Sequence, residues 1–465
     1  MHKRHGVLGA LVVALLSACA VGPNYVRPDT AAPASFGSLV NSTYSVENTV
    51  EQFWKQFGDE TLNRLISEAM AANHDLRIAL ARLHEARAAR GESRFDFAPT
   101  VSASGGYTQQ RLARSQRIGS TPDETDLYDA GFDAFWELDF FGRVRRGFEA
   151  RNAQVGAAEA NLRDAQTIVM AEVARTYLEL RGQQSQLDVA RRNVANQTDT
   201  LKLTNARLDA GQGTELDTSR AQAQLSATLA TIAPLETAVA RSIHRLSVLT
   251  GREPTVLIAS LSPPGELPPL PQIVAVGNPA DLLRRRPDIR VAERNLATST
   301  ALVGVAVADL FPKVTFTGSV GYAAGSADAL GDLGTRTQLI APAISWAALD
   351  LGRVRARIAG ARARNEASLA LYEQTVLRAL EETEDALITH ARARERLEHI
   401  VASERASRTA AQLARVRYDG GMVDFLEVLD AERTLLAAED DLAQSRTATG
   451  TSLIAVYKAL GRGWY

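Results

Sequence analysis

Hydrophobic residues follow two different periods along this chain. Within residues 128–138 every second residue is apolar, and the positions between them hold mostly aspartate, glutamate or glycine. This alternation is typical of a β-strand with one apolar and one polar face. Residues 59–95 instead place apolar side chains such as Leu62, Leu65 and Ile66 on one stripe, which is the spacing of a helix. We therefore expect a chain that combines helices with a few strands.

The same alternation predicts four strands, which form two pairs separated by polar or glycine-rich loops. They cover residues at about 99–111, 127–139, 312–323 and 337–350. With about 9–11 residues each, such strands have the length that crosses an outer membrane. Aromatic residues near the strand ends suit a girdle at the membrane surface: Tyr107, Tyr128, Trp136, Tyr322 and Trp346. The alternative is a pair of ordinary soluble hairpins that pack on the helices.

The small number of strands limits how they can cross a membrane. Four strands are too few to close a barrel, and an open sheet edge is not stable in lipid. If these strands span a membrane, several chains must therefore contribute to one barrel. Two chains would supply about eight strands around a filled interior, whereas three would supply about twelve strands around a lumen.

Very long helical segments follow the strand pairs. Residues 143–207 contain no proline, and leucine or valine recurs every seven residues from Leu180 to Leu208. This heptad spacing predicts a coiled coil, and a helix of about 65 residues reaches roughly 100 Å. We expect long helical hairpins at residues 143–250 and 353–460, with a kink or break at Pro234. A rod of this length is long enough to cross the periplasm.

The pattern of helices and strands occurs twice. Trp136-Glu-Leu-Asp-Phe-Phe-Gly-Arg-Val-Arg145 returns 210 residues later as Trp346-Ala-Ala-Leu-Asp-Leu-Gly-Arg-Val-Arg355. Arg207-Leu-Asp-Ala-Gly211 returns at the same offset as Arg417-Tyr-Asp-Gly-Gly421. An equal offset at two distant landmarks indicates a duplicated unit. We expect a first structural repeat at residues 59–254, a linker at 255–280 and a second repeat at 281–465.

The first residues read as a processing signal. A basic start, His2-Lys-Arg-His5, precedes the apolar residues 6–16, and Leu16-Ser-Ala-Cys19 is similar to the lipobox of bacterial lipoproteins. We expect a signal peptide at residues 1–18, acylation with palmitate-like chains at Cys19, and a lipid-anchored segment at 19–58. By resemblance to enterobacterial lipoproteins, the lack of Asp after Cys19 favours sorting to the outer membrane of a Gram-negative bacterium. The alternative is a plain signal peptide with a chance cysteine.

Composition excludes several classes of function. A formal net charge of -2 gives no reason to expect nucleic-acid binding. The seven histidines do not follow a metal-ligand spacing such as His-Glu-x-x-His, and the sequence contains no glycine loop for a nucleotide. We therefore expect neither an enzyme nor a bound cofactor or metal. Cys19 is the only cysteine, so no disulfide can form within the chain.

Several motifs together resemble the TolC-like outer membrane efflux family, in particular its NodT- and OprM-type lipoprotein branch. They are Cys19-Ala-Val-Gly-Pro-Asn-Tyr25, Asp281-Leu-Leu-Arg-Arg-Arg-Pro-Asp-Ile-Arg290, the two Gly-Arg-Val-Arg strand exits, and Arg417-Tyr-Asp-Gly-Gly421 followed by Leu426-Glu-Val-Leu-Asp-Ala-Glu432. The resemblance covers the mature chain and implies a mainly α-helical homotrimer. Each chain would give four strands to a twelve-stranded transmembrane β-barrel and its long helices to an α-helical barrel in the periplasm. The implied partners are a periplasmic adaptor protein and an inner-membrane pump of the RND type.

The resemblance also indicates the residues of a functional site. Glu427 and Asp430 match acidic positions that line the periplasmic aperture in the family, and Asp424 lies one turn earlier. In several copies these acids would form stacked rings, which favour cations in a narrow pore. The alternative is that acids near a helix start only complement its dipole. The hairpin tips match the surface that meets the adaptor: Arg207, Leu208, Gly211, Arg417, Tyr418, Gly420 and Gly421.

The function that these features imply is a passive exit duct for small molecules such as drugs. Two alternatives remain open at this point. One is a membrane-anchored coiled-coil scaffold without a pore, and the other is the exit duct of a type I protein secretion system. Conductance across a planar bilayer separates a duct from a scaffold.

Overall fold

The structure is a computed structural model that describes residues 20–29, 32–38, 44–45, 52–116 and 124–461. The predicted signal peptide and the predicted acylation of Cys19 lie outside these described residues. The chain divides into two compact units. The first contains residues 1–29, 82–159 and 291–373, and the second contains residues 30–81, 160–290 and 374–465. Each unit therefore contains parts of both sequence repeats.

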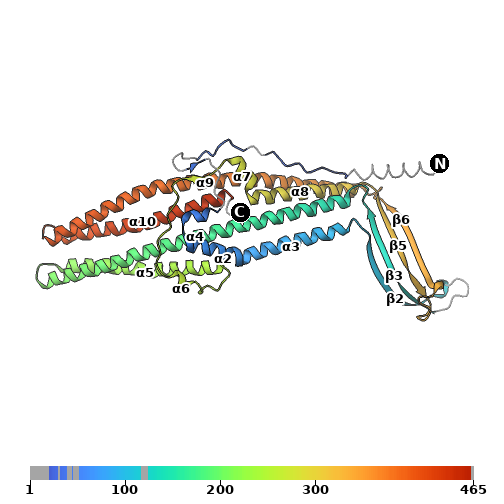
Figure 1. Cartoon of the computed structure of the whole chain (residues 1–465), viewed down its shortest axis with the longest axis horizontal. Coiled ribbons are helices and arrows are strands. Elements are labelled where there is room, and N and C mark those ends of the chain that lie inside the picture. The colour runs from blue at the N-terminus through green and yellow to red at the C-terminus, as the bar shows by residue number, and fades with distance from the viewer. Residues whose placement is uncertain (1–19, 30–31, 39–43, 46–51, 117–123, 462–465) are drawn as a thin grey trace. The chain divides into compact units, whose positions relative to one another are not determined.

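The first unit contains a four-stranded antiparallel sheet in the order β2-β3-β5-β6 (Figure 1). Its strands are β2 Thr100–Arg111, β3 Glu124–Leu138, β5 Lys313–Ala324 and β6 Arg336–Ser345, with the short helices η2 Arg114–Gln116 and η3 Leu333–Thr335 in the loops. Because β3 pairs with β5, the strand pairs of the two repeats join in one sheet. Parts of four helices complete the unit: α3 His74–Phe95, α4 Arg143–Asp209, α8 Pro287–Ala308 and α9 Leu351–Asp419.

The alternation of side chains along β3 continues across the neighbouring strands. Phe132 lies opposite Val320, and Trp136 lies opposite Phe316. Residues directly opposite each other in an antiparallel pair share one face of the sheet, so the apolar face extends over several strands. Phe132 is 59% exposed and Ile340 on β6 is 74% exposed, although both side chains are large and apolar. A continuous apolar surface of this kind indicates contact with lipid or with another protein.

The last strand, β6, ends earlier than the alternation predicts. Lys313, the first residue of β5, pairs with Ser345, and the ladder stops there. Pro312 precedes Lys313 and has no backbone N–H to donate to a further pair. Trp346 lies just beyond the strand, where its indole Nε1 donates a hydrogen bond to the carbonyl of Leu310, 2.9 Å away.

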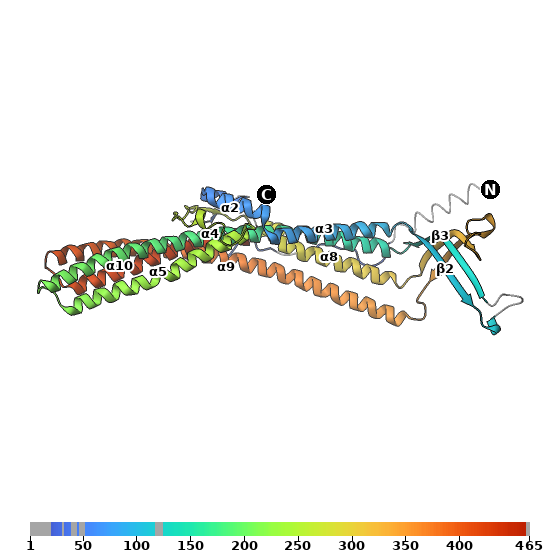
Figure 2. The same ribbon diagram turned by 90° about the horizontal axis from the view of Figure 1, so that it is seen from below.

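Long helices make up most of the second unit. α5 Glu215–Leu249 and α10 Phe425–Ala459 return along α4 and α9 and form two helical hairpins (Figure 1, Figure 2). The shorter elements are β1 Tyr44–Ser45, η1 Phe53–Phe57, α2 Glu60–Ala72, α6 Ile258–Leu261, β4 Val274–Ala275 and α7 Pro279–Arg285. Among the described residues, none of the helices combines the length and the apolar character that a membrane crossing needs.

The helix α5 continues through Pro234 without a break. A proline inside a helix removes the hydrogen bond to the carbonyl four residues earlier, which here belongs to Ala230. Both residues are exposed, so water can satisfy this carbonyl. The cost of the proline is therefore small enough for the packing of the hairpin to keep the helix continuous.

The single helix predicted over residues 59–95 is divided at Asn73 into α2 and α3. Asn73 has an extended backbone, with φ -62° and ψ 133°. Its Oδ1 accepts hydrogen bonds from the N–H groups of Asp75, at 2.8 Å, and Leu76, at 3.2 Å, as an N-cap residue does. Its Nδ2 donates to the carbonyl of Leu249 at the end of α5, 2.9 Å away. Helical periodicity does not reveal this break, because the bond to Leu249 joins distant parts of the sequence.

We expect Asn73→Ala to destabilise the protein, because it removes these three hydrogen bonds at a buried position. The expected loss is about 1–3 kcal/mol, the range for an N-cap and for a buried group left without a partner. Unfolding of the detergent-solubilised protein, followed by circular dichroism, measures it. The matched control Asn196→Ala, at an exposed position of α4, should change the stability by less than about 0.5 kcal/mol. Equal effects of the two variants would contradict this role for Asn73.

The second unit also contains a buried histidine. His390 is 1% exposed; its Nδ1 lies 3.0 Å from the hydroxyl of Ser452, and its Nε2 has no hydrogen-bond partner among the described residues. Burial, assisted by the charge of Arg394, lowers the pKa of His390 to about 4. His390 is therefore neutral in the folded chain at neutral pH.

His390 should make the protein less stable as the pH falls from about 6.5 to 4. In this window a histidine of the unfolded chain, whose pKa is about 6.5, binds a proton that the folded state does not accept. Above about pH 6.5 both states leave this residue neutral, so it adds no pH dependence. Chemical unfolding at a series of pH values should show a smaller slope for His390→Gln. His399→Gln, at an exposed position of the same helix, is the control, and an unchanged slope in His390→Gln would contradict the prediction.

Candidate functional site at the hairpin tips

Both helical hairpins turn in the same way at their tips. The N–H of Gly211 donates to the carbonyl of Leu208, and the N–H of Gly421 donates to the carbonyl of Tyr418, both at 2.9 Å. Gly211 and Gly421 have positive φ angles of 72° and 69°, which residues other than glycine rarely adopt. Gly420 directly precedes the second of these glycines. The tip residues named from the sequence therefore lie in or beside two equivalent turns.

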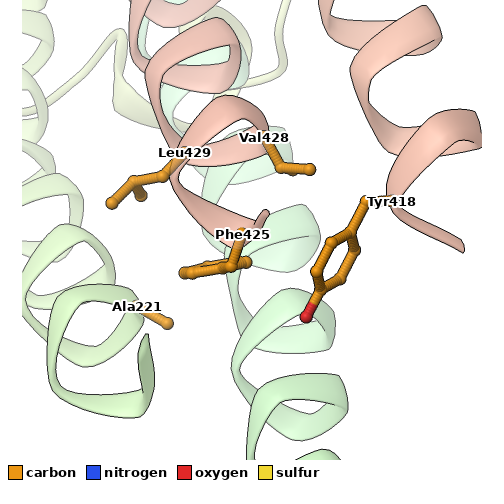
Figure 3. Packing of buried hydrophobic residues seen from close by; sticks show 5 residues of the cluster. All are labelled: Ala221, Tyr418, Phe425, Val428 and Leu429. Atoms are coloured by element: carbon orange, nitrogen blue, oxygen red, sulfur yellow. The ribbon is translucent and has the colours of Figure 1, made fainter. Parts of the chain in front are cut away.

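A small apolar cluster joins the two hairpins next to these turns. Tyr418, Phe425, Val428 and Leu429 of the second hairpin pack with Ala221 of α5, and all five are buried (Figure 3). Half-buried side chains surround them: Leu201, Leu203, Ala414 and Val423. Together, the cluster and the side chains around it involve all four helices of the two hairpins, and they pack against the first turns of α10.

The three acids predicted to form the gate lie on the side of α10 that the cluster does not cover. Asp424, Glu427 and Asp430 are exposed and are spaced three residues apart, so they follow one side of the helix. Asp424 is the N-cap residue, but its side chain makes no capping hydrogen bond. Within the part of the chain that the structure describes, no three His, Cys, Asp or Glu side chains are placed to hold a metal ion. The site is therefore a row of carboxylates that faces solvent in the single chain.

One basic side chain lies close to this row. Arg417 Nη1 is 3.8 Å from Glu427 Oε2, across the turn of the second hairpin. Both side chains are more than half exposed, at 56% and 57%, so water screens the pair and it contributes at most about 1 kcal/mol. The family resemblance does not identify a basic partner for the acids. The tight turn at Gly420 and Gly421 is the feature of the sequence that indicates Arg417 as this partner, because it brings the end of α9 beside the start of α10.

A second contact joins the two tips to each other. The guanidinium carbon of Arg207 lies 4.0 Å from the centre of the Tyr418 ring, and Arg207 Nη2 donates to the Tyr418 carbonyl at 3.3 Å. Tyr418 is buried and Arg207 is half-buried, so the attraction between the cation and the aromatic face lies between the value for an exposed site, about 0.5–1 kcal/mol, and that for a desolvated one, about 2 kcal/mol. Both residues are expected at the tips from the sequence, but nothing in the sequence indicates that they touch. The contact connects α4 of the first hairpin with α9 of the second.

Glu432, further along α10, differs from the exposed acids. Its side chain is 16% exposed, and its Oε1 lies 3.6 Å from Arg415 Nη1. Burial raises the pKa of Glu432, and the charge of Arg415 only partly offsets this effect. Glu432 therefore belongs to the contact between α9 and α10 rather than to the exposed row.

At the start of α5, an acidic residue caps the helix, unlike the exposed acids at the start of α10. The hydroxyl of Thr214, the N-cap residue, accepts from the N–H of Asp217 at 3.3 Å, and Asp217 Oδ2 accepts from the N–H of Thr214 at 3.2 Å. This reciprocal arrangement is a capping box, which stabilises the first turn. Asp217 is thus part of the helix start, whereas Glu215 is exposed. The two tips share a backbone geometry and differ in their charges.

Comparison with known proteins extends over nearly the whole chain. The family described as Outer membrane efflux protein matches residues 65–252 and 278–462. Outer membrane protein OprJ of Pseudomonas aeruginosa is 31% identical over 462 residues, which cover 99% of this chain and 96% of OprJ. The toluene efflux pump outer membrane protein TtgC of Pseudomonas putida is 31% identical over 464 residues, which cover 98% of this chain and 95% of TtgC.

A solved structure agrees with this comparison in its fold. The outer-membrane channel OprN is 44% identical and has a TM-score of 0.90, and the match covers 96% of this chain and 100% of OprN. The family match includes both strand pairs and both helical hairpins. The chain therefore belongs to the outer membrane efflux protein family, in its NodT- and OprM-type branch, and is an outer-membrane efflux channel.

Proposed function

We propose that three copies of this chain form the exit duct of a tripartite efflux system, with an acidic aperture at the hairpin tips. A periplasmic adaptor and an inner-membrane pump of the RND type deliver small molecules to it, and acyl chains on Cys19 anchor it to the outer membrane. The observation that carries the proposal is the exposed row of Asp424, Glu427 and Asp430 on α10. A threefold axis turns this row into stacked acidic rings.

The open edges of the sheet support an assembly of several copies. Within the described sheet, β2 and β6 each pair with one neighbour, so each leaves one row of N–H and C=O groups without a partner. Such groups must be satisfied in lipid. Pairing β6 of one copy with β2 of the next satisfies them and closes a sheet. Three copies give about twelve strands and leave a lumen, whereas two give about eight strands with a filled interior.

The charge of the aperture supports small neutral or cationic molecules as cargo. Carboxylate rings in a narrow opening attract cations and repel anions. The relative TtgC is named as a toluene efflux protein, and toluene is a small uncharged molecule. The equivalent turns at the two tips, which carry Arg207, Leu208 and Gly211 in one hairpin and the related residues in the other, form the surface for the adaptor.

Neutralising the acids should change the ion selectivity of the duct. We expect the double variant Glu427→Gln and Asp430→Asn to lower the ratio of cation to anion permeability by about five-fold, the factor that corresponds to about 1 kcal/mol. Reversal potentials of the purified protein in planar bilayers measure this ratio. Glu215→Gln, at the equivalent tip of the first hairpin, should leave the ratio nearly unchanged. A protein that never conducts, even after both acids are neutralised, would exclude the duct.

The contact between Arg207 and Tyr418 should restrain the aperture, because it ties the two hairpins together. We expect Arg207→Ala and Tyr418→Leu each to raise the conductance of the closed channel. The two changes should not fully add: their coupling should be about 0.5–2 kcal/mol, because each of them removes the contact between the guanidinium and the ring, whereas the hydrogen bond to the Tyr418 carbonyl is lost only in Arg207→Ala. Conductance of the single and double variants measures the coupling. Lys202→Ala, at an exposed position of α4, is the control, and fully additive effects would refute the restraint.

A further inference from the structure

A buried arginine binds the N-terminal segment of the described chain. Arg146, in the first turn of α4, has a side chain that is 5% exposed. Its Nε donates to the carbonyl of Val21 at 3.2 Å, and its Nη2 donates to Asn24 Oδ1 at 2.7 Å and to the carbonyl of Gly22 at 3.4 Å. In return, the N–H of Val21 donates to the carbonyl of Phe141 at 3.1 Å. A guanidinium that is removed from water needs such acceptors, and this segment supplies three of them.

The backbone of the segment approaches its neighbours very closely. Gly22 has a φ of +89°, and a Cβ at this position would lie 2.5 Å from the Cα of Gly304 in α8. A Cβ on Gly142, between β3 and α4, would lie 2.7 Å from the Cα of Ala20. Both distances are too short for any side chain, so glycine is required for the segment to lie here.

Tyr25 joins the N-terminal segment to α8 by a hydrogen bond and a contact with an arginine. Its hydroxyl donates to Glu293 Oε1 at 2.8 Å, and the guanidinium of Arg294 lies 5.5 Å from the centre of its ring. Glu293 is 5% exposed and also pairs with Arg294. Burial by itself would raise the pKa of Glu293, but the hydrogen bonds from Arg294 and Tyr25 outweigh it, so the pKa is lowered. Glu293 is therefore charged, and Tyr25 satisfies part of that buried charge.

We infer that residues 20–25 form an N-terminal clasp, which joins α4 of the first repeat to α8 of the second and sets the place of the lipid anchor. The clasp holds Ala20 against the turn between β3 and α4. The acyl chains expected on the preceding residue then leave the protein where the strands meet the helices. There the rings of Phe141 and Phe311 stack with their centres 4.7 Å apart and offer an apolar surface for hydrocarbon.

The clasp changes what a lipid anchor can do. An anchor on a flexible linker only tethers a protein to the membrane and leaves its orientation free. An anchor held at the ends of the strands keeps the sheet at the membrane surface, where its strands must pair. The contacts of the clasp stand on their own; its effect on the anchor rests on the acylation of Cys19 that belongs to the proposed function.

Two substitutions within the clasp test the inference on the full-length protein. Asn24→Ala removes the shortest of the bonds that join the clasp to Arg146, and Gly22→Ala introduces a Cβ against α8. Hydrogen exchange should become at least about ten-fold faster at the amide of Val21 and in the first turn of α4, because exchange follows local opening. The recovery of assembled protein in the outer membrane should fall several-fold, while the incorporation of labelled palmitate per chain stays at the wild-type level. Val26→Ala, which lies just outside the clasp at a position that is 79% exposed, is the matched control and should change neither quantity.

Any other result of these measurements would contradict the inference, either in the clasp itself or in its role for the lipid anchor. Wild-type exchange rates in both variants would overturn the clasp itself. Faster exchange with wild-type recovery, or a loss of palmitate in parallel with the loss of recovery, would overturn its role in placing the anchor. Tyr25→Phe, which keeps the ring and loses only the hydroxyl, replaces Gly22→Ala if that variant does not fold, and it should accelerate exchange as well. These measurements do not involve conductance, so they can fail while the proposed duct holds, and the reverse is also true.

Discussion

The backbone of a strand carries hydrogen-bonding groups along both of its edges, and the outer strands of this sheet use only one. β2 and β6 each leave one edge unpaired within the described sheet, and the apolar face exposes large side chains such as Phe132 and Ile340. A sheet of this kind gains stability by covering both features. In the proposed closure by three copies the edges pair with one another, and the lipid of the membrane covers the apolar face. The first turns of α4 and α9 follow β3 and β6 directly in the chain, so the proposed closure also brings these turns around the same axis.

The two repeats keep the same backbone and differ in their charges. At the end of β3, Glu137 pairs with Arg143, and Asp139, just beyond the strand, pairs with Arg145 at 3.1 Å; the side chains of these two acids are only 16% and 13% exposed. After β6, Arg353 occupies the position of Arg143 but pairs with Asp350, whose counterpart in the first repeat is Phe140, and these two side chains are 73% and 55% exposed. The tips also differ, since the N-cap residue Thr214 forms a capping box with Asp217, whereas the N-cap residue Asp424 makes no capping hydrogen bond through its side chain. A turn geometry that depends on glycine survives duplication, and the side chains around it are free to diverge. The proposed threefold ring of acids therefore uses only one of the two repeats.

Several features follow from local residue patterns. The alternation along β3 and the helical stripe of α10 depend on neighbours a few residues apart, so both are visible in the sequence. Gly211 and Gly421 lie 210 residues apart and both have positive φ, so the equivalence of the two tips is also visible in the sequence. The break at Asn73 and the early end of β6 do not follow from local residue patterns. The first depends on a bond to Leu249, and the second depends on where β5 begins, which periodicity within one segment does not encode.

The candidate site also has features that follow from the local sequence and features that depend on the folded chain. The amino-acid pattern is sufficient to place Asp424, Glu427 and Asp430 beside a tight turn on one side of a helix, because their spacing is set by the helix itself. The contact of Arg207 with Tyr418 and the binding of residues 21–24 by Arg146 required the folded chain. Each joins side chains more than 100 residues apart, as the numbering shows. Local periodicity is a property of neighbouring residues, whereas such contacts depend on which helices pack together, and only the tertiary structure decides that.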